Sequence, residues 1–202
     1  MRHSFHFYHK YNMINRKRNR LKYYDYSQAG WYYVTICPKD HKSYFGKIEN
    51  EEMILNELGK IVDECWQKIE TLHKNIELDL SVIMPNHIHG IIIINVVDEN
   101  LSSTNRDAKF TSFRDAKFAS PTNVIVKNAD RTKMELSKVI QQFKRAVTMQ
   151  VKTVDENSTF KWQRSFYDRI IRNEKELFNI RKYIQQNPLK WDLEKGVDNL
   201  DL

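Results

Sequence analysis

The segment MPNHIHGIIII, residues 84–94, places two histidines one residue apart at the start of a run of isoleucines. In a β-strand, side chains two residues apart project from the same face, so His87 and His89 point together while Ile88 points to the layer behind. Paired imidazoles bind divalent metals, and a catalytic metal site uses few protein ligands and leaves positions open. The alternative, two histidines hydrogen-bonded at a strand end, is left open by the pair alone.

The elements that must position this pair follow from hydrophobic periodicity. Strands are predicted at 31–37, 76–84, 87–97 and 160–172, and amphipathic helices at 51–73, 134–154 and 173–188. The order strand, helix, strand, strand, helix, strand predicts an α+β fold, a ferredoxin-like antiparallel sheet in split βαβ order with an additional C-terminal helix. A short strand at 44–48 is expected to pair at an edge.

Three of these segments carry further local signals. Apolar residues alternate along 76–84, which indicates a strand with one buried face, and Pro85 and Asn86 then form a turn. The strand at 87–97 is apolar on both faces and is expected to be central. The last helix opens on an asparagine cap at Asn173, and its end is marked by Pro188.

Composition predicts one folded domain: 202 residues, 41% hydrophobic and 12% aromatic. The longest apolar run, 90–97, is interrupted by Asn95 and is too short to span a membrane, and the first residues do not form a secretory signal. Cys37 and Cys65 lie far apart without a CxxC pairing, so neither a disulfide framework nor a thiolate zinc site is expected.

Positive charge is concentrated near the N-terminus. The chain has a formal net charge of +7, and residues 1–24 contain seven Lys or Arg and no acid. The densest part of this basic arm holds Arg16, Lys17, Arg18 and Arg20, among aromatic residues that suit stacked bases. A solvated tail is the alternative.

Residues 98–131 are polar and contain the direct repeat NRDAKFTS and FRDAKFAS. So short a unit cannot bury a core, which favours an inserted surface loop over a second domain. Contact of this loop with DNA is an alternative to an ordinary solvated loop.

Separated motifs in a fixed order resemble one known family. VIMPNHIHGIIII, FKRAVT, WQRSFYDRIIRNE and IRKYIQQNP are similar to the REP-associated tyrosine transposases, within the single-tyrosine HUH (IS200-like) transposases. The resemblance runs from YDYSQAGWYYVTIC at 24–37 to Trp191. It implies a transposase and endonuclease domain at 25–192, between the basic arm at 1–24 and a C-terminal tail at 193–202.

The resemblance also implies the site. The family comprises metal-dependent single-stranded DNA endonucleases and strand transferases whose nucleophile is a tyrosine, here Tyr183, on the helix after the last core strand. An amide one turn later, here Asn187, completes a Mg²⁺ or Mn²⁺ site with His87 and His89. Residues four apart share a helix face, which allows the phenol and the amide to address the histidines together.

Two other interpretations of the tyrosines stay open from the residues. Without the resemblance, Tyr183 reads as an aromatic residue packed beside Leu177, Ile180 and Ile184. Tyr167 is the competing nucleophile, but its i+4 position is Ile171, which cannot bind a metal. Packing or stacking on DNA is the interpretation favoured for Tyr167.

By resemblance, Tyr183 attacks single-stranded or hairpin DNA and forms a 5′-phosphotyrosine without ATP. Lys144 and Arg145, with the basic arm, are expected to contact phosphates. A non-catalytic repeat-DNA-binding protein and a metal phosphodiesterase that uses water are the rival functions. We expect a cytoplasmic, nucleoid-associated protein, either monomer or homodimer.

Overall fold

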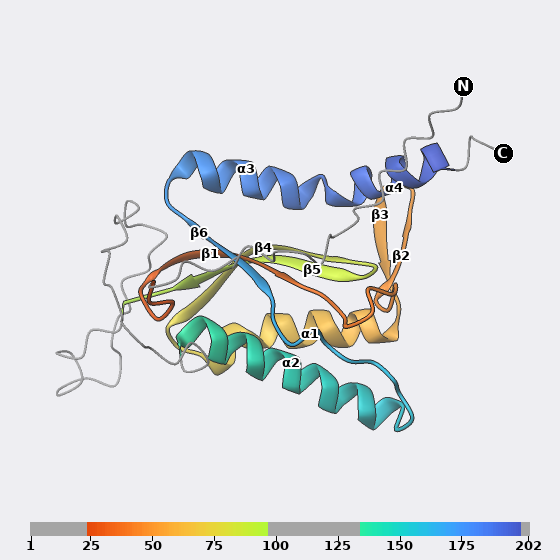
Figure 1. Cartoon of the computed structure of the whole chain (residues 1–202), viewed down its shortest axis with the longest axis horizontal. Helices are drawn as coiled ribbons and strands as arrows, with labels where there is room; N and C mark the ends of the chain where they lie inside the picture. Colours follow the sequence, from red (N-terminus) through yellow and green to blue (C-terminus); the bar gives the residue numbers. More distant parts are fainter. Residues whose placement is uncertain (1–23, 97–133, 199–202) are drawn as a thin grey trace, which may run out of the picture.

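The computed structural model describes residues 24–96 and 134–198, with the side chains of the last helix described as far as Leu193. Its centre is a four-stranded antiparallel sheet in the order β4-β5-β1-β6. These strands are β1 (Gly30–Ile36), β4 (Ile76–Met84), β5 (His87–Ile94) and β6 (Tyr167–Ile171). Helices α1 (Glu57–Leu72) and α2 (Glu135–Val154) cover one face, and α3 (Glu174–Gln185) lies on the other (Figure 1). The predicted α+β class is confirmed.

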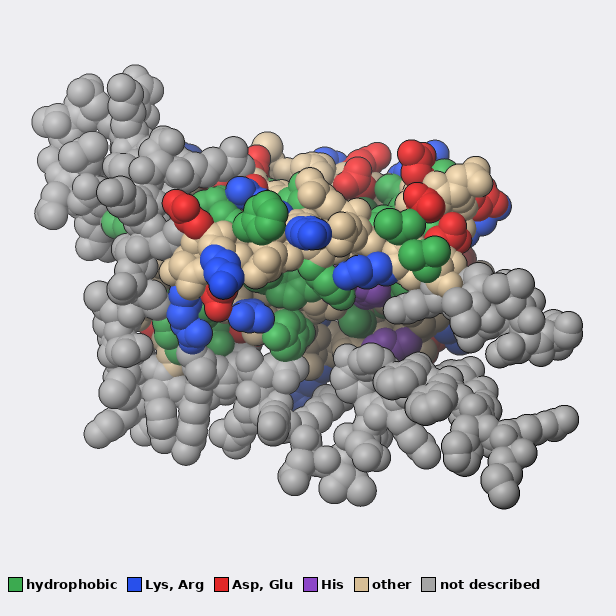
Figure 2. All heavy atoms as spheres, turned by 90° about the horizontal axis from the view of Figure 1, so that it is seen from above, with side chains coloured by type: hydrophobic (Ala, Val, Ile, Leu, Met, Phe, Trp, Pro, Cys, Tyr) green, Lys and Arg blue, Asp and Glu red, His purple; other side chains and the backbone are tan. Residues whose placement is uncertain are grey.

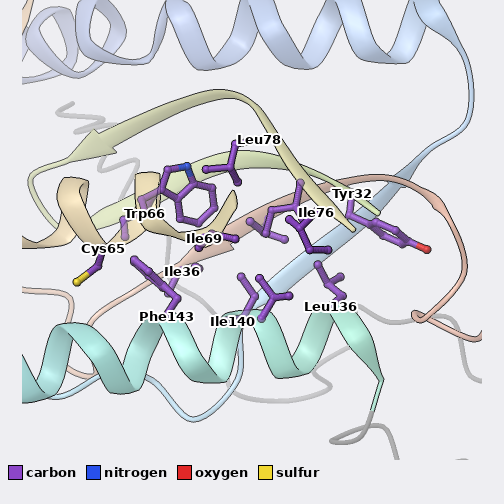
Figure 3. Packing of buried hydrophobic residues seen from close by; sticks show 14 of the residues in the cluster. Tyr32, Ile36, Cys65, Trp66, Ile69, Ile76, Leu78, Leu136, Ile140 and Phe143 are labelled. Carbon is purple, nitrogen blue, oxygen red and sulfur yellow. The ribbon is translucent and has the colours of Figure 1, made fainter. Parts of the chain in front are cut away.

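Strand β5 is central and buried on both faces, as the isoleucine run predicts. Ile88, Ile92 and Ile94 pack in the core beneath α1 and α2, and Ile91 and Ile93 pack under α3. Figure 3 shows the larger core, where Phe143 and Ile140 of α2 approach Trp66 and Ile69 of α1. Each fully buried isoleucine contributes about 1.5–3 kcal/mol from burial, so the strand that carries the histidines is firmly anchored.

Close packing explains two glycines. A Cβ at Gly59 would lie 2.0 Å from the backbone oxygen of Phe45, so only glycine lets α1 approach that segment. A Cβ at Gly90 would lie 2.3 Å from the Trp66 ring. Gly90 therefore allows the indole to lie directly on β5, one residue after His89.

The segment before α1 differs from its prediction. Residues 52–55, expected to begin a helix, form strand β3 (Glu52–Leu55), which pairs with β2 (Gly46–Glu49) in a ribbon separate from the main sheet. Asn50 and Glu51 join them with φ of 52° and 66°, the left-handed turn that suits a two-residue hairpin. The helix begins later because the Asn56 side chain accepts the Gly59 N–H.

The prediction that β4 has one buried face is wrong. A β-bulge shifts the register, so that Leu78 pairs with Ile92 whereas Ser81 pairs with Gly90. Leu78 faces the core beneath α1, whereas Leu80 and Val82 pack under α3. The extra residue thus moves the even-numbered side chains after the bulge, Leu80 and Val82, to the face that α3 covers. Alternation in the sequence alone cannot show this change of face.

The C-terminal elements match the prediction only in part. Strand β6 covers 167–171 rather than the whole of 160–172. Asn173 caps α3 as predicted, with its side chain accepting the Glu176 N–H. The sequence did not predict α4 (Asn187–Asp198), which begins immediately after α3 and carries Pro188 in its first turn, where its missing N–H costs little.

Within the two described ranges, no helix has the length and apolarity of a membrane span. The basic arm and the loop at 98–131 lie outside the described residues.

Candidate functional site

The two histidines project together from the first residues of strand β5. The hairpin turn at Pro85 and Asn86 makes His87 the first residue of the strand, and His89 follows on the face that α3 covers. Their Nε2 atoms lie 2.9 Å apart, and His89 is buried. Histidine side chains reach the surface on this face, beside lysine or arginine side chains (Figure 2).

Hydrogen bonds on the outer ring nitrogens fix the protonation of the pair. The Nδ1–H of His87 donates to Asn86 Oδ1 at 2.6 Å, so its Nε2 carries a lone pair. On His89, Nδ1 lies 2.7 Å from the Tyr33 hydroxyl and 2.9 Å from Thr35 Oγ1. With Thr35 donating to the Tyr33 hydroxyl at 3.3 Å and Tyr33 donating to Nδ1, His89 carries its proton on Nε2 and donates it to His87, so both rings are neutral.

Burial favours the neutral form of both rings. Burial, and then the nearby His41, lower the pKa of His87 to about 4. Burial, and then His87 itself, lower the pKa of His89 to about 3. Both imidazoles are therefore uncharged at neutral pH, the form that binds a metal. The hydroxyls beside His89 Nδ1 can accept as well as donate, so the proton on Nε2 can move to Nδ1 and free Nε2 for a ligand bond.

Helix α3 brings Tyr183 to this pair. The Tyr183 hydroxyl lies 3.4 Å from His89 Nε2, and its ring meets the His89 ring edge to face with centroids 5.2 Å apart. The residue is 42% exposed, so one side of the phenol is open to a ligand. Lys190 of α4 places its Nζ 5.4 Å from the centre of the Tyr183 ring.

Two kinds of contact hold α3 in place. Leu177, Ile180 and Ile184 are buried against the sheet, and these are the residues beside which Tyr183 was alternatively expected to pack. Arg181 makes two hydrogen bonds to Asp79 of β4, at 2.7 and 2.9 Å. The structure thus buries the apolar stripe of α3 and leaves the Tyr183 hydroxyl at the imidazoles.

Asn187 lies at the start of α4 and is buried. Its Nδ2 has no hydrogen-bond partner among the residues the structure describes. Trp191, one turn later on the same helix face, has its ring 6.0 Å from the His87 ring, so this face of α4 meets the histidine pair. Among the described residues no hydrogen bond joins the Asn187 amide to either imidazole, so its role as a ligand stays a prediction.

The geometry of the pair suits a shared cation. Two nitrogen ligands about 2.1 Å from one ion and at right angles stand about 3.0 Å apart, close to the separation found here. In the described part of the chain, no group of three His, Cys, Asp or Glu side chains is placed to hold a metal. A cation at His87 and His89 would therefore complete its shell with amide, phosphate or water oxygens, a set that Mn²⁺ accepts readily and Mg²⁺ less so.

The other predicted residues lie elsewhere. Lys144 is on α2, on the opposite face of the sheet, and its Nζ donates to the backbone oxygens of Gln163 and Ser165 at 2.9 and 3.1 Å. Arg145 is exposed on the same helix. Arg16, Lys17, Arg18 and Arg20 lie outside the described residues.

Sequence reasoning missed the groups that orient the histidines. Tyr33 and Thr35 are two apart on β1, and register places Thr35 directly opposite His89. Nothing in the order of strands gives that register. Asn86 was assigned only to the turn, whereas its Oδ1 orients His87 and its Nδ2 donates to the backbone oxygen of His41. Its position next to a histidine was the available signal.

Fold and site together define an α+β protein whose central strand presents an imidazole pair to a tyrosine-bearing helix. The chain is 34% identical, over 188 residues, to a protein of Haemophilus influenzae described as uncharacterized, a match that covers 92% of this chain and 96% of that one. It belongs to the same family as that protein. No protein-family model matches the chain. A solved structure of a REP-associated tyrosine transposase bound to a REP hairpin matches over 85% of this chain and 72% of its own, with a TM-score of 0.45 and 16% identity.

Proposed function

We propose that this protein is a metal-dependent single-stranded DNA endonuclease and strand transferase, in which Tyr183 forms a 5′-phosphotyrosine intermediate at hairpin or repeat DNA. The observation that carries the proposal is the approach of the Tyr183 hydroxyl to His89, at 3.4 Å, from a different element of the fold. Nucleophile and ligand pair come from residues 94 positions apart, so proximity in sequence does not bring them together.

Further observations support the proposal. The motifs of the sequence resemble the single-tyrosine HUH transposases in the types and order of their residues. The strand order β4-β5-β1-β6, with α1 leading into β4 and α2 leading into β6, supports a ferredoxin-like core. Asn187 has a buried amide whose Nδ2 has no hydrogen-bond partner among the described residues, and the oxygen of that amide is the proposed ligand atom.

Each residue has a chemical task in this proposal. The Tyr183 oxygen bonds to the phosphorus, the bond to the 3′ oxygen breaks, and the proton lost by the phenol is balanced by one gained at that 3′ oxygen. One phosphoester replaces another, so the step needs no nucleotide cofactor and is reversible. Lys190, beside the Tyr183 ring, stabilises negative charge that develops on the phenol oxygen.

His87, His89 and Asn187 are the proposed ligands of Mg²⁺ or Mn²⁺, which when bound would polarise a non-bridging phosphate oxygen. Asn86, Tyr33 and Thr35 hold the two rings so that both Nε2 atoms face one point. The basic arm, Lys144 and Arg145 are proposed to contact phosphates of the flanking DNA.

The test is an incubation of labelled single-stranded hairpin DNA with the protein and Mn²⁺. We expect a covalent protein–DNA adduct that survives denaturation, is lost in Tyr183→Phe and persists in the matched control Tyr167→Phe. Cleavage without an adduct would instead identify a phosphodiesterase that uses water. Binding with neither product would identify a non-catalytic DNA-binding protein.

A further inference from the structure

Tyr167 lies in the same cross-strand row as the histidine pair. Thr35 of β1 pairs with His89 on one side and with Tyr167 on the other, so the three side chains share one face of the sheet. Neighbouring strands are about 4.8 Å apart, which puts the backbone of Tyr167 about 10 Å from that of His89. The row connects the candidate metal site to the edge strand β6.

The ring of Tyr167 is held in place but not covered. Tyr33, which is buried, meets Tyr167 edge to face at 6.2 Å, and also meets Tyr183 at 6.4 Å and stacks on His89 at 5.5 Å. Tyr167 itself remains 39% exposed. An aromatic surface that is fixed before binding loses little conformational entropy when a planar ligand stacks on it.

The surroundings of Tyr167 favour an anionic ligand with a planar group. Residues 164–192 contain seven Lys or Arg and four Asp or Glu. Among them, Arg169 lies two residues from Tyr167 on the same face of β6, where its side chain is 53% exposed and paired with Glu176, and Lys190 lies over the Tyr183 ring without a described acidic partner. Single-stranded nucleic acid combines both features, because its bases stack on exposed rings and its phosphates contact cations.

We propose that Tyr167 is a stacking site for a base of single-stranded DNA flanking the phosphate that Tyr183 attacks. The inference rests on the proposed function, and it assigns Tyr167 a binding role rather than a nucleophilic one. The ring face carries this role, so phenylalanine preserves it and an aliphatic residue removes it.

The experiment uses the full chain in a Tyr183→Phe background, which prevents covalent reaction. The dissociation constant for fluorescently labelled single-stranded DNA is measured for this parent, and with Tyr167→Phe, Tyr167→Ala or Tyr167→Val added. Valine suits a strand, so it separates loss of stacking from loss of fold. Phe178→Ala is the matched control, because Phe178 is an aromatic residue on α3 that is 65% exposed and makes no ring contact with the site among the described residues.

We expect Tyr167→Ala and Tyr167→Val to weaken binding roughly tenfold or more, the effect of losing one base–aromatic stack. Tyr167→Phe and Phe178→Ala should bind within about twofold of the parent. 2-Aminopurine placed at positions flanking the cleavage site should be quenched in the parent at one position and released in Tyr167→Ala.

Different failures have different meanings. Unchanged affinity in Tyr167→Ala, with a parent that binds DNA, overturns the stacking site and leaves the proposed function standing. Weakening in Tyr167→Phe equal to that in Tyr167→Ala also overturns it, because the hydroxyl and not the ring would then matter. A parent that binds no single-stranded DNA overturns the proposed function and this inference together.

Discussion

Replacement of Asp79 by asparagine tests whether the ion pair to Arg181 positions the tyrosine helix. Arg181 is two residues before Tyr183 on α3, and Asp79 lies at the bulge of β4. The pair ties α3 to β4, and a second ion pair, between Glu176 and Arg169 of β6 at 3.1 Å, ties the first turn of α3 to the opposite edge of the sheet. Leu177, Ile180 and Ile184 supply the apolar contact. Loss of the charge should therefore loosen the orientation of α3 without unfolding it.

The free energy that the Asp79–Arg181 pair contributes is estimated from its geometry and the exposure of its side chains. Exposed ion pairs contribute about 0.2–1 kcal/mol, and charge-assisted bidentate bonds are roughly twice as strong as neutral ones. The Asp79 side chain is 15% exposed and that of Arg181 is 43% exposed, which places this pair near the upper limit. We expect a coupling free energy of about 1–2 kcal/mol and a melting temperature lowered by roughly 2–8 °C in Asp79→Asn.

The catalytic effect should exceed what stability alone predicts. A displacement of about 1 Å in a reacting group costs up to roughly a hundredfold in rate, so even a partial shift of Tyr183 should slow adduct formation about tenfold. The rate is measured under single-turnover conditions, well below the melting temperature of each variant.

A double-mutant cycle with Asp79→Asn and Arg181→Gln isolates the pair from other effects of each change. The control is the same cycle on Glu64 and Lys68, an exposed pair on α1 with 3.9 Å between its charged atoms, where coupling below about 0.5 kcal/mol is expected. The reasoning is refuted by equally small coupling at Asp79, or by a wild-type rate of adduct formation in Asp79→Asn.

Three further predictions concern the histidine strand. Asn86→Ala should weaken Mn²⁺ binding about 10- to 100-fold by isothermal titration calorimetry, because His87 loses the group that sets its tautomer; unchanged affinity would contradict this. The metal-free protein should lose stability as pH falls below about 6.5, since the folded pKa values of about 4 for His87 and about 3 for His89 lie below the ordinary value and only the unfolded chain then takes up protons. Urea midpoints between pH 7 and pH 4.5 measure this loss, and it should shrink when both histidines are replaced by glutamine. Gly90→Ala should lower the free energy of unfolding by about 1–3 kcal/mol, measured by urea denaturation, because its Cβ would overlap Trp66.

Most of the helices and strands were predicted from local signals, because caps and hydrophobic periodicity depend only on residues that are close in the sequence. The isoleucine run after His89 identified a central strand, and Asn173 identified the start of α3. The helix expected from residue 51 failed because the periodicity of its first residues also fits a strand, and the left-handed turn at Asn50 decided between them. The bulge in β4 follows from pairing with β5, which no local pattern contains.

The candidate site residues likewise fall into those that local spacing predicts and those that only tertiary packing brings together. His87 and His89 were found because their shared face depends only on spacing within a strand. Tyr183 and Asn187 came from the resemblance of motifs, because the distance between α3 and β5 is set by tertiary packing. Thr35 was missed for a related reason: its contact with His89 depends on strand register, and register depends on the whole sheet.

The histidine pair lies on a central strand and Tyr183 lies on a helix with fewer contacts to the sheet. Mutations around the histidines and mutations around α3 should therefore have different effects. The imidazoles belong to a central strand with hydrogen-bonded neighbours on both sides and with hydroxyl and amide partners at their outer nitrogens. The phenol belongs to a helix held by three apolar side chains and two ion pairs, Arg181 to Asp79 and Glu176 to Arg169. Changes at Asn86, Tyr33 or Thr35 should therefore alter metal affinity and leave the single-turnover rate at saturating metal nearly intact. Changes at Asp79 or Arg181 should slow that rate and leave metal affinity unchanged, because α3 can shift while the paired nitrogens of β5 stay where the sheet holds them.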